Sequence, residues 1–198
     1  MTETEIRQIF VEKEALLEGH FKLTSGRHSD LYVQCALVLQ YPEVSERLGV
    51  ALVQRIREEN AGIPVKVNAV CAPAVGGIIL GHVVARALSV RAVFAERENG
   101  QGPLKLRRGF VIKPGESVLA VEDVVTTGGS LKEVVQLIQS NGARAIGVAA
   151  VAERSATPVD FGCSKTVLLK LPLKDYSQET CPQCQSGVPL VKPGSRAE

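Results

Sequence analysis

The 198-residue chain has no tryptophan, a single methionine and an aromatic content of only 4%, so aromatic rings contribute little to its core. Hydrophobic residues make up 45% of the sequence, and the core must therefore be built from Val, Leu, Ile and Ala. The sequence also lacks any run of about 18 apolar residues, which argues against a membrane span. Its formal net charge of +2 argues against a generic nucleic-acid-binding surface.

The start of the chain does not resemble a secretory signal. The first five residues, Met1 to Glu5, are acidic and polar, unlike the basic and apolar start of a secretory signal. We therefore expect a cytoplasmic protein with no nucleic acid and no membrane among its partners. No internal repeat is present, and the length suits one domain.

Cysteine is present five times, at positions 35, 71, 163, 181 and 184, and an odd number does not suggest a disulfide framework. Such cysteines fit a reducing compartment. Cys181 and Cys184 form a lone C-x-x-C, whereas a four-cysteine zinc site needs a second pair at that spacing. We favour a structural turn or a weak redox pair here over a metal site, for which Cys163 or the pair of a second chain could provide the missing ligands.

The central feature of the sequence is the stretch from Val118 to Ser130. Its first four residues are apolar and predict a strand that is covered on both faces. Glu122 and Asp123 follow, where that strand should reach the surface. Residues 126–130 contain nothing bulky, so the backbone there can approach a ligand closely.

A helix is predicted directly after this loop. Ser130 and Glu133 have the spacing of a capping box, and Gly142 is placed to end the helix. The apolar residues of this segment recur at helical spacing: Leu131, Val134, Val135 and Ile138. Because a helix N-terminus attracts phosphate and carboxylates bind sugar hydroxyls, the stretch predicts a sugar-phosphate site. The alternative is an ordinary turn between a strand and a helix, and the usual dinucleotide and nucleoside triphosphate signatures are absent.

The remaining pattern alternates strands and helices. We predict helices over 3–18, 42–59, 77–88 and 130–142, strands over 67–72, 90–95, 118–121, 145–152 and 166–171, and two short strands around 21–23 and 31–33. This alternation predicts an α/β protein with a mostly parallel sheet and helices on both faces. Residues 96–109 are mostly polar or Gly, and predict either a mobile active-site lid or a solvated hairpin. We expect an irregular tail after residue 172, with residues 193–198 loose.

The stretch Val118 to Ser130 resembles the phosphoribosyl-pyrophosphate (PRPP) binding motif of type I phosphoribosyltransferases. In both, an apolar strand precedes two acids, two apolar residues and a loop of Thr and Gly. The resemblance implies the type I phosphoribosyltransferase fold, in a single domain over residues 1–198. Its core would span about 42–171, and a small hood would comprise about 1–40 plus the C-terminal segment.

The hairpin residues resemble one branch of that family, the orotate phosphoribosyltransferases, whose hood carries a Phe-x-Leu-x-Ser-Gly-x-x-Ser segment. The matching residues here are Phe21, Leu23, Ser25, Gly26 and Ser29. The resemblance implies transfer of the phosphoribosyl group of PRPP to orotate, giving orotidine 5′-monophosphate and pyrophosphate in pyrimidine (UMP) biosynthesis. It also implies Mg²⁺ as cofactor, and a homodimer whose lid loop contributes to the neighbouring site.

The resemblance further assigns roles to particular residues. It implies that Lys105 and Asp123 are catalytic. The implied PRPP-binding residues are Arg97, Lys105, Glu122, Asp123, Val124, Val125, Thr126, Thr127, Gly128, Gly129 and Ser130. The implied orotate-binding residues are Ser25, Gly26, Thr126 and Arg154. No protein residue is assigned as a metal ligand, because substrate and water would hold the Mg²⁺.

The chain departs from the family pattern at three places. Some relatives carry Lys before the Ser-Gly of the hood, where this chain has Thr24, and many carry Lys where this chain has Gly76. Many relatives also have a His in the loop that corresponds to residues 96–109, and this loop has none. Two other functions therefore remain open: a phosphoribosyltransferase for a purine or uracil, and a PRPP-sensing regulator without catalysis. Arg154 favours a carboxylated base over a neutral one, and the short chain leaves little room for a nucleic-acid-binding segment.

Overall fold

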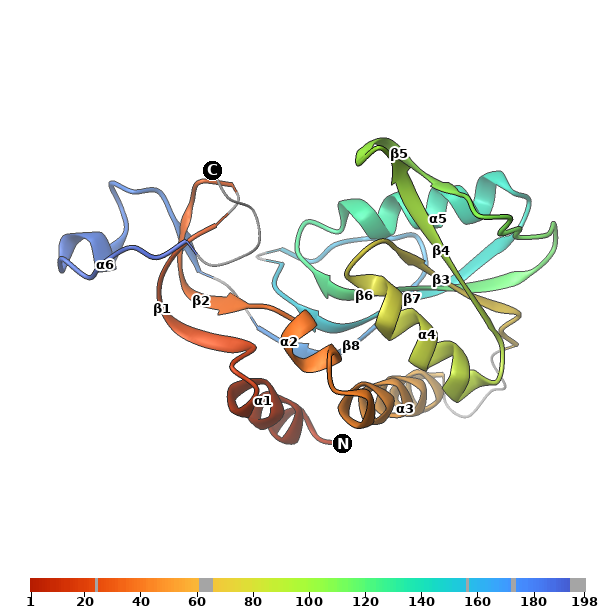
Figure 1. Cartoon of the computed structure of the whole chain (residues 1–198), viewed down its shortest axis with the longest axis horizontal. Coiled ribbons are helices and arrows are strands. Elements are labelled where there is room, and N and C mark those ends of the chain that lie inside the picture. Colours follow the sequence, from red (N-terminus) through yellow and green to blue (C-terminus); the bar gives the residue numbers. More distant parts are fainter. Residues whose placement is uncertain (24, 61–65, 156, 172–173, 193–198) are drawn as a thin grey trace.

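The computed structural model describes residues 1–23, 25–60, 66–155, 157–171 and 174–192, and its centre is a six-stranded sheet (Figure 1). The strand order is β5-β4-β3-β6-β7-β8, and every neighbouring pair is parallel except β4 with β5. The strands are β3 (Ala69–Pro73), β4 (Arg91–Glu98), β5 (Gln101–Leu106), β6 (Ser117–Val125), β7 (Arg144–Glu153) and β8 (Ser164–Lys170).

Helices cover both faces of this sheet (Figure 1). On one face, α3 (Pro42–Glu59) and α4 (Gly77–Leu88) pack against a core that includes Leu119 and Val121 of β6. On the other face, α5 (Gly129–Ser140) packs against a core that includes Val118 and Ala120. Alternate side chains of β6 thus enter two different cores, which explains why the strand is apolar without interruption.

A smaller sheet lies beside the main one and joins the two ends of the chain (Figure 1). Its order is β1-β2-β9, and both pairs are antiparallel. The remaining elements are α1 (Glu3–Glu12), β1 (Leu16–Lys22), β2 (His28–Val33), α2 (Ala36–Leu39), β9 (Asp175–Tyr176) and α6 (Pro182–Gln185). The C-terminal segment therefore adds a strand to the N-terminal hairpin.

The α/β class, the mostly parallel sheet and both flanking helix layers are confirmed. The helices predicted over 42–59 and 77–88 have those bounds in the structure. The helix predicted over 3–18 is too long, since it ends at Glu12. Glu14 turns the chain with a φ of +53°, and Leu16 then pairs with Val33 in the hairpin. Strand pairing with β2 overrides the helical pattern of these residues.

Two other features affect the site. Residues 101–106 form strand β5, which pairs with β4, so the 96–109 segment has the hairpin structure that was one of the two predicted alternatives. Strand β6 extends to Val125, four residues beyond its predicted end. Thr24 and residues 193–198 lie outside the described residues, so the expectations about them stay predictions. Within the part of the chain that is described, no helix is long and apolar enough to cross a membrane.

Candidate active site

Two neighbouring acids lie near the end of β6, at the carboxyl edge of the parallel sheet. The sequence analysis placed Glu122 and Asp123 after the strand, but both are within it, since β6 continues and Val125 pairs with Glu153 of β7. Both side chains are partly buried. Ligands of open α/β sheets bind at this edge, so the acids occupy the expected place for a binding site.

The environment of the two acids favours their neutral forms. Burial, together with the charge of Asp123, raises the pKa of Glu122 to about 8, and a hydrogen bond from Ser130 opposes that shift. Burial also raises the pKa of Asp123, although the backbone N–H of Val124 donates to its Oδ1 at 2.9 Å. None of the ion pairs among the described residues involves either acid. The pair is therefore suited to a ligand that brings hydroxyl donors or positive charge.

The loop after β6 has the shape of an anion cradle. Thr126 and Thr127 are exposed, and Gly128 has a left-handed φ of +76°. A Cβ atom at Gly128 would lie only 2.6 Å from Cγ1 of Val159, so both conformation and space require glycine there. Helix α5 begins at Gly129, and its N-cap has no side-chain capping hydrogen bond. The positive end of the helix is thus left to a ligand.

The predicted capping box is wrong, and the residues assigned to it have other partners. The Ser130 hydroxyl hydrogen-bonds to Glu122 instead of to the helix backbone. The Glu133 carboxylate accepts hydrogen bonds from Arg97 and from the backbone N–H of Leu104. These two tertiary contacts override the local capping pattern, because each places a carboxylate against a donor from another element.

The loop between β3 and α4 forms the opposite wall. A Cβ atom at Gly76 would lie 2.9 Å from both Oδ1 and Oδ2 of Asp123, so the carboxylate occupies the space of a side chain at this position. This contact gives a physical reason for the glycine where many family members carry Lys. The Ala74–Val75 peptide bond of the loop is cis, and the backbone N–H of Ala74 donates to the carbonyl of Ala95 at 2.7 Å.

Arg154 is a partly buried cation that forms no ion pair with the described residues. Its backbone N–H donates to the Val125 carbonyl at 2.7 Å, which holds it next to the end of β6. Its Nε is buried and has no hydrogen-bond partner among the described residues. Burial lowers the pKa of Arg154, while Cys35 and Tyr32 oppose that shift. An unsatisfied guanidinium N–H is costly, so this group is suited to an anionic ligand.

No salt bridge joins Arg154 to its neighbour Glu153 among the described residues. Glu153 instead forms an ion pair with Lys165, and its Oε1 accepts a hydrogen bond from the Ser155 hydroxyl at 2.8 Å. The two partners draw Glu153 toward β8 and leave Arg154 free for the site.

The hood contributes two residues that the sequence analysis missed. Tyr32 of β2 and Cys35 lie close enough to Arg154 to influence its pKa. The Cys35 thiol also donates to the Asp123 carbonyl, with an Sγ–O distance of 3.6 Å, which ties the hood to β6. No local motif marks either residue; only the docking of the hood against the sheet brings them to the site.

The hood loop with Ser25 and Gly26 is exposed and tightly turned. The backbone N–H of Leu23 donates to Arg27 at 2.7 Å, and Gly26 adopts a left-handed φ of +81°. Nothing lies within 4 Å of a Cβ atom built at Gly26, so the loop is open to an approaching ligand. No contact among the described residues joins Ser25 or Gly26 to Arg154.

The hairpin residues are likewise separate from the two acids. Arg97 forms a bidentate ion pair with Glu133 of α5, at 2.6 and 3.0 Å. Lys105 is exposed, and its Nζ lies 3.9 Å from Glu98. The described contacts therefore dock the hairpin on α5 and do not bring Arg97 or Lys105 to Glu122 and Asp123.

Comparison with known proteins agrees with this fold. A family model for the phosphoribosyl transferase domain matches residues 40–176, and the chain therefore belongs to that family. Two similar relatives are both named orotate phosphoribosyltransferase. The protein of Carboxydothermus hydrogenoformans is 52% identical over 192 residues, covering 97% of each chain. That of Thermotoga maritima is 49% identical over 191 residues, covering 96% of this chain and 98% of its own.

Solved structures agree on the fold. Orotate phosphoribosyltransferase of Aeropyrum pernix has a TM-score of 0.69 at 21% identity, over 84% of this chain and 93% of its own. Adenine phosphoribosyltransferase of Thermoanaerobacter pseudethanolicus has a TM-score of 0.58 at 20% identity, over 71% of this chain and 88% of its own. At such identities these likenesses concern the fold alone.

The raised pKa of Glu122 predicts how stability varies with pH in the ligand-free protein. The usual carboxyl pKa is 4.5 and the folded value is about 8, so between these pH values the folded state keeps a proton that the unfolded state loses. The free energy of unfolding should therefore fall as the pH rises through this window. Thermal melts should show this decline, and Glu122→Gln should reduce it, whereas Glu18→Gln at an exposed position should leave it in place. An unchanged decline in Glu122→Gln would contradict the assignment.

Proposed function

We propose that this protein transfers the phosphoribosyl group of PRPP to orotate, giving orotidine 5′-monophosphate and pyrophosphate in pyrimidine biosynthesis. The observation that carries the proposal is the partly buried Arg154, whose buried Nε has no hydrogen-bond partner among the described residues, beside an anion cradle and two acids. Relatives at about half identity over nearly the whole chain, named orotate phosphoribosyltransferase, support the choice of base. We also place the protein in the cytoplasm, which suits five free cysteines.

The end of β6 and its loop would bind PRPP. The backbone N–H groups of residues 126–130 and the positive end of α5 suit the 5′-phosphate. Glu122 and Asp123 suit the ribose hydroxyls, because hydroxyl donors stabilise the ionised form of carboxyl groups whose pKa burial raises. Val124 and Val125 continue the strand and set the loop's position.

Arg154 would bind the orotate carboxylate. A guanidinium matches a carboxylate with two parallel hydrogen bonds, and a neutral purine or uracil would leave its charge buried and unpaired. Ser25 and Gly26 would cover the base from the hood loop, whose open backbone suits such a contact. Thr126 would lie between the two substrates, because it follows Val125, whose carbonyl accepts the backbone hydrogen bond of Arg154.

The reaction needs no protein nucleophile. The bond from ribose C1 to pyrophosphate weakens as N1 of orotate approaches, and positive charge develops on the ribose ring. Asp123 lies beside the ribose in this arrangement and would stabilise that charge. Arg97 and Lys105 would stabilise the leaving pyrophosphate, and the two binding sites hold the reactants in position.

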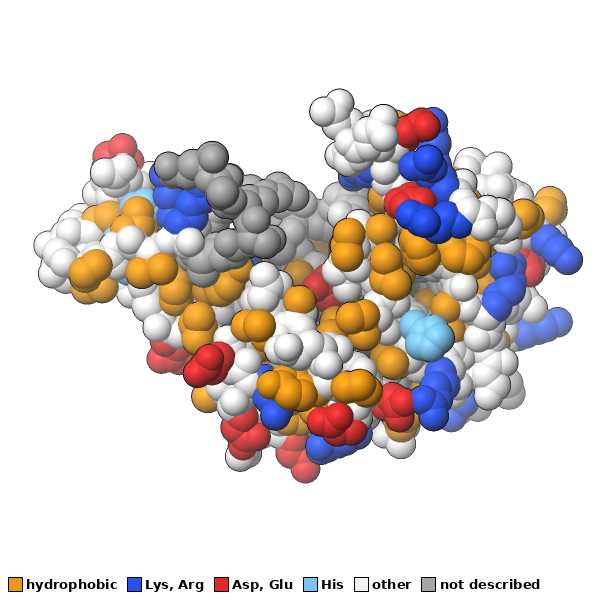
Figure 2. All heavy atoms as spheres, in the orientation of Figure 1, with side chains coloured by type: hydrophobic (Ala, Val, Ile, Leu, Met, Phe, Trp, Pro, Cys, Tyr) orange, Lys and Arg blue, Asp and Glu red, His pale blue; other side chains and the backbone are white. Residues whose placement is uncertain are grey.

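Since Arg97 and Lys105 contact neither acid within one chain, we propose that the protein is a homodimer in which the hairpin of each subunit serves the neighbouring site. Lys105 is exposed on that hairpin. Hydrophobic side chains gather on the face that carries α4, next to the charged hairpin (Figure 2), and Val75 and Ile79 are exposed. Such a surface suits a second copy of the chain.

Magnesium fits the same site. The two acids have raised pKa values and no ion-pair partner among the described side chains, so a bound cation beside them would stabilise their ionised forms. When bound, Mg²⁺ would neutralise pyrophosphate charge, with substrate oxygens and water as its main ligands. Glu122 and Asp123 would orient the ribose hydroxyls that face it.

An absorbance assay tests the proposed reaction directly. With PRPP and Mg²⁺ present, the protein should consume orotate and release pyrophosphate. Omitting PRPP or orotate should abolish both signals. Turnover of uracil, adenine, guanine or hypoxanthine without turnover of orotate would overturn the proposed base, and binding of PRPP without any turnover would indicate a regulator instead.

Arg154→Ala should raise the KM for orotate by about 30-fold or more. Truncating one partner of a buried charge pair weakens binding by about 2 kcal/mol or more. The KM for PRPP should change little. Arg154→Lys should fall between, since a lysine keeps the charge but loses the bidentate geometry. Arg144→Ala, at the other end of β7, is the matched control. An orotate KM that stays at the wild-type value in Arg154→Ala would refute the assigned role.

Mixing two inactive variants tests the shared site. Lys105→Ala and Asp123→Asn should each lose most activity, but after subunit exchange one site of each mixed dimer has both native residues. Random pairing should then restore about a quarter of the wild-type activity. Mixing Asp123→Asn with Arg154→Ala should give no activity beyond that of the Arg154→Ala subunits themselves, because both residues belong to the same subunit's half of a site. A Lys105→Ala mixture that stays inactive after verified exchange would mean that the hairpin does not serve the neighbouring site.

A further inference from the structure

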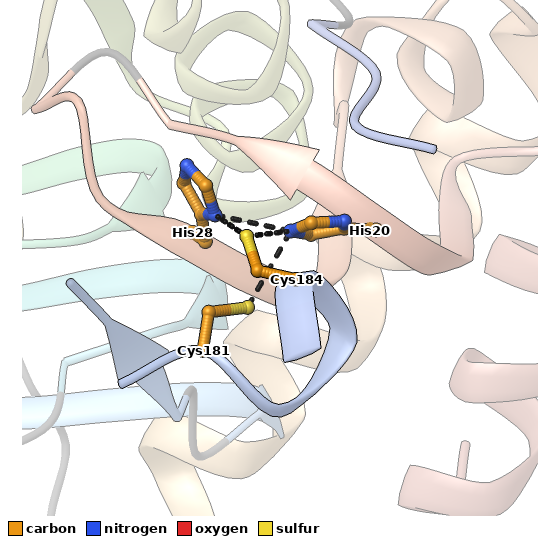
Figure 3. A group of neighbouring side chains, drawn as sticks. All are labelled: His20, His28, Cys181 and Cys184. Carbon is orange, nitrogen blue, oxygen red and sulfur yellow. Dashed lines mark hydrogen bonds between the residues drawn. The ribbon is translucent and has the colours of Figure 1, made fainter. Parts of the chain in front are cut away.

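Four potential metal ligands converge away from the proposed active site (Figure 3). His20 lies on β1 and His28 on β2. Cys181 is the N-cap residue of α6, and Cys184 lies within that helix. The exposed fraction is 3% for His20, 2% for His28 and 1% for Cys181, and Cys184 is partly buried. The sequence analysis lacked a second pair of ligands for the C-x-x-C motif, and the hairpin histidines supply it.

The ligand atoms are spaced as a tetrahedral metal site requires. Nε2 of His20 lies 3.0 Å from Nδ1 of His28, 3.4 Å from Sγ of Cys181 and 3.5 Å from Sγ of Cys184. Sγ of Cys184 is 3.2 Å from Nδ1 of His28, and all four atoms lie within 4.8 Å of one another. A zinc ion with bonds of about 2.1 Å to nitrogen and 2.3 Å to sulfur separates its ligands by roughly 3.4–3.8 Å. Only small shifts would therefore accommodate the ion.

The hydrogen bond behind His20 prepares it as a ligand. Its Nδ1 lies 2.8 Å from the Val188 carbonyl, which can only accept, so the ring proton sits on Nδ1. Nε2 therefore presents its lone pair to the centre of the cluster. Metal-bound histidines commonly have such a carbonyl partner on the other ring nitrogen, which fixes both the tautomer and the ring orientation.

The turn that carries the cysteines has the compact backbone of a metal-binding knuckle. The N–H of Gln185 donates to the Cys181 carbonyl at 3.2 Å, and the N–H of Gly187 donates to the Cys184 carbonyl at 3.1 Å. Gly187 takes a left-handed φ of +70°, which ends the turn. Both thiols are thereby aimed at the histidines, as Figure 3 shows.

The cluster lies where the C-terminal segment meets the hairpin, and that junction has little apolar packing. Val188, Leu190 and Val191 are all exposed. Backbone hydrogen bonds join Val191 to His20 and to Lys22, each at 2.8 Å. A short segment with so little buried apolar surface commonly depends on a metal or a disulfide for its stability.

We propose that His20, His28, Cys181 and Cys184 bind one structural Zn²⁺ that holds the C-terminal segment against the hood hairpin. Two nitrogen and two sulfur ligands in a tetrahedral arrangement select zinc among the common divalent ions. Four protein ligands leave no open position for substrate or water, so the role is structural. The site is distinct from the carboxylates of β6, and it supports the hairpin whose loop carries Ser25 and Gly26.

Metal analysis of the intact protein tests the proposal. Protein purified under reducing conditions without chelator should contain about one zinc ion per chain, as measured by inductively coupled plasma mass spectrometry. Cys184→Ser and His28→Ala should lose it, while Cys163→Ser and His82→Ala, outside the cluster, should retain it. Reduced protein that holds no zinc and takes up none on addition of zinc salt would overturn the proposal, as would an equivalent of iron in its place or a Cys181–Cys184 disulfide in freshly isolated protein.

Cobalt replacement in the wild-type protein identifies the ligands even if a ligand variant fails to fold. Co²⁺ should give the intense visible bands of a tetrahedral ion, together with thiolate charge-transfer absorption for two cysteines. A pale octahedral spectrum without thiolate absorption would refute the ligand set.

Removing the zinc with a chelator should also lower the melting temperature and expose residues 174–192 to proteolysis. Unchanged melting and cleavage would refute the structural role.

Discussion

The structure depends on one electrostatic constraint, which is that two adjacent carboxylates are held partly buried at the end of β6 with no cation among the described residues to balance them. Burial and mutual repulsion raise the pKa of Glu122 to about 8. The surroundings preserve this arrangement: Gly76 leaves room for the Asp123 carboxylate, and Ser130 turns its hydroxyl to Glu122 rather than to its own helix. A protein that needed only stability would not leave such a pair without a partner.

Arg154 is the counterpart of the acids, since it is a partly buried cation with no anionic partner among the described residues. The two groups lie close through the backbone contact between Arg154 and Val125, yet no ion pair joins them among the described residues. A sugar phosphate with hydroxyls on one side and a carboxylated base on the other would satisfy both groups. The two acids, the loop after β6 and Arg154 thus meet within one chain, whereas the contacts of Arg97 and Lys105 are with Glu133 and Glu98.

The C-terminal segment gives the hood its second attachment. The first is the Cys35 thiol at the Asp123 carbonyl, which joins hood and sheet. The second is the group of two histidines and two cysteines. It joins the hood hairpin to the C-terminal segment, since His20 and Cys181 are in contact although they lie 161 positions apart in the sequence. A rigid hairpin at this point would present the hood loop to the site at a constant position.

Local patterns in the sequence determined the α/β class, the helices over 42–59 and 77–88, the buried faces of β6 and α5, and the position of the loop of small residues between them. Each depends on neighbours in the chain, so periodicity and residue size are enough to predict it. Tertiary structure alone decided the end of α1, where pairing with β2 overrides the helical pattern, and the partners of Ser130 and Glu133. It also decided the isolation of Arg154 and the meeting of His20 and His28 with the C-x-x-C motif. These features arise from contacts between distant elements, whose energies no local window of sequence contains.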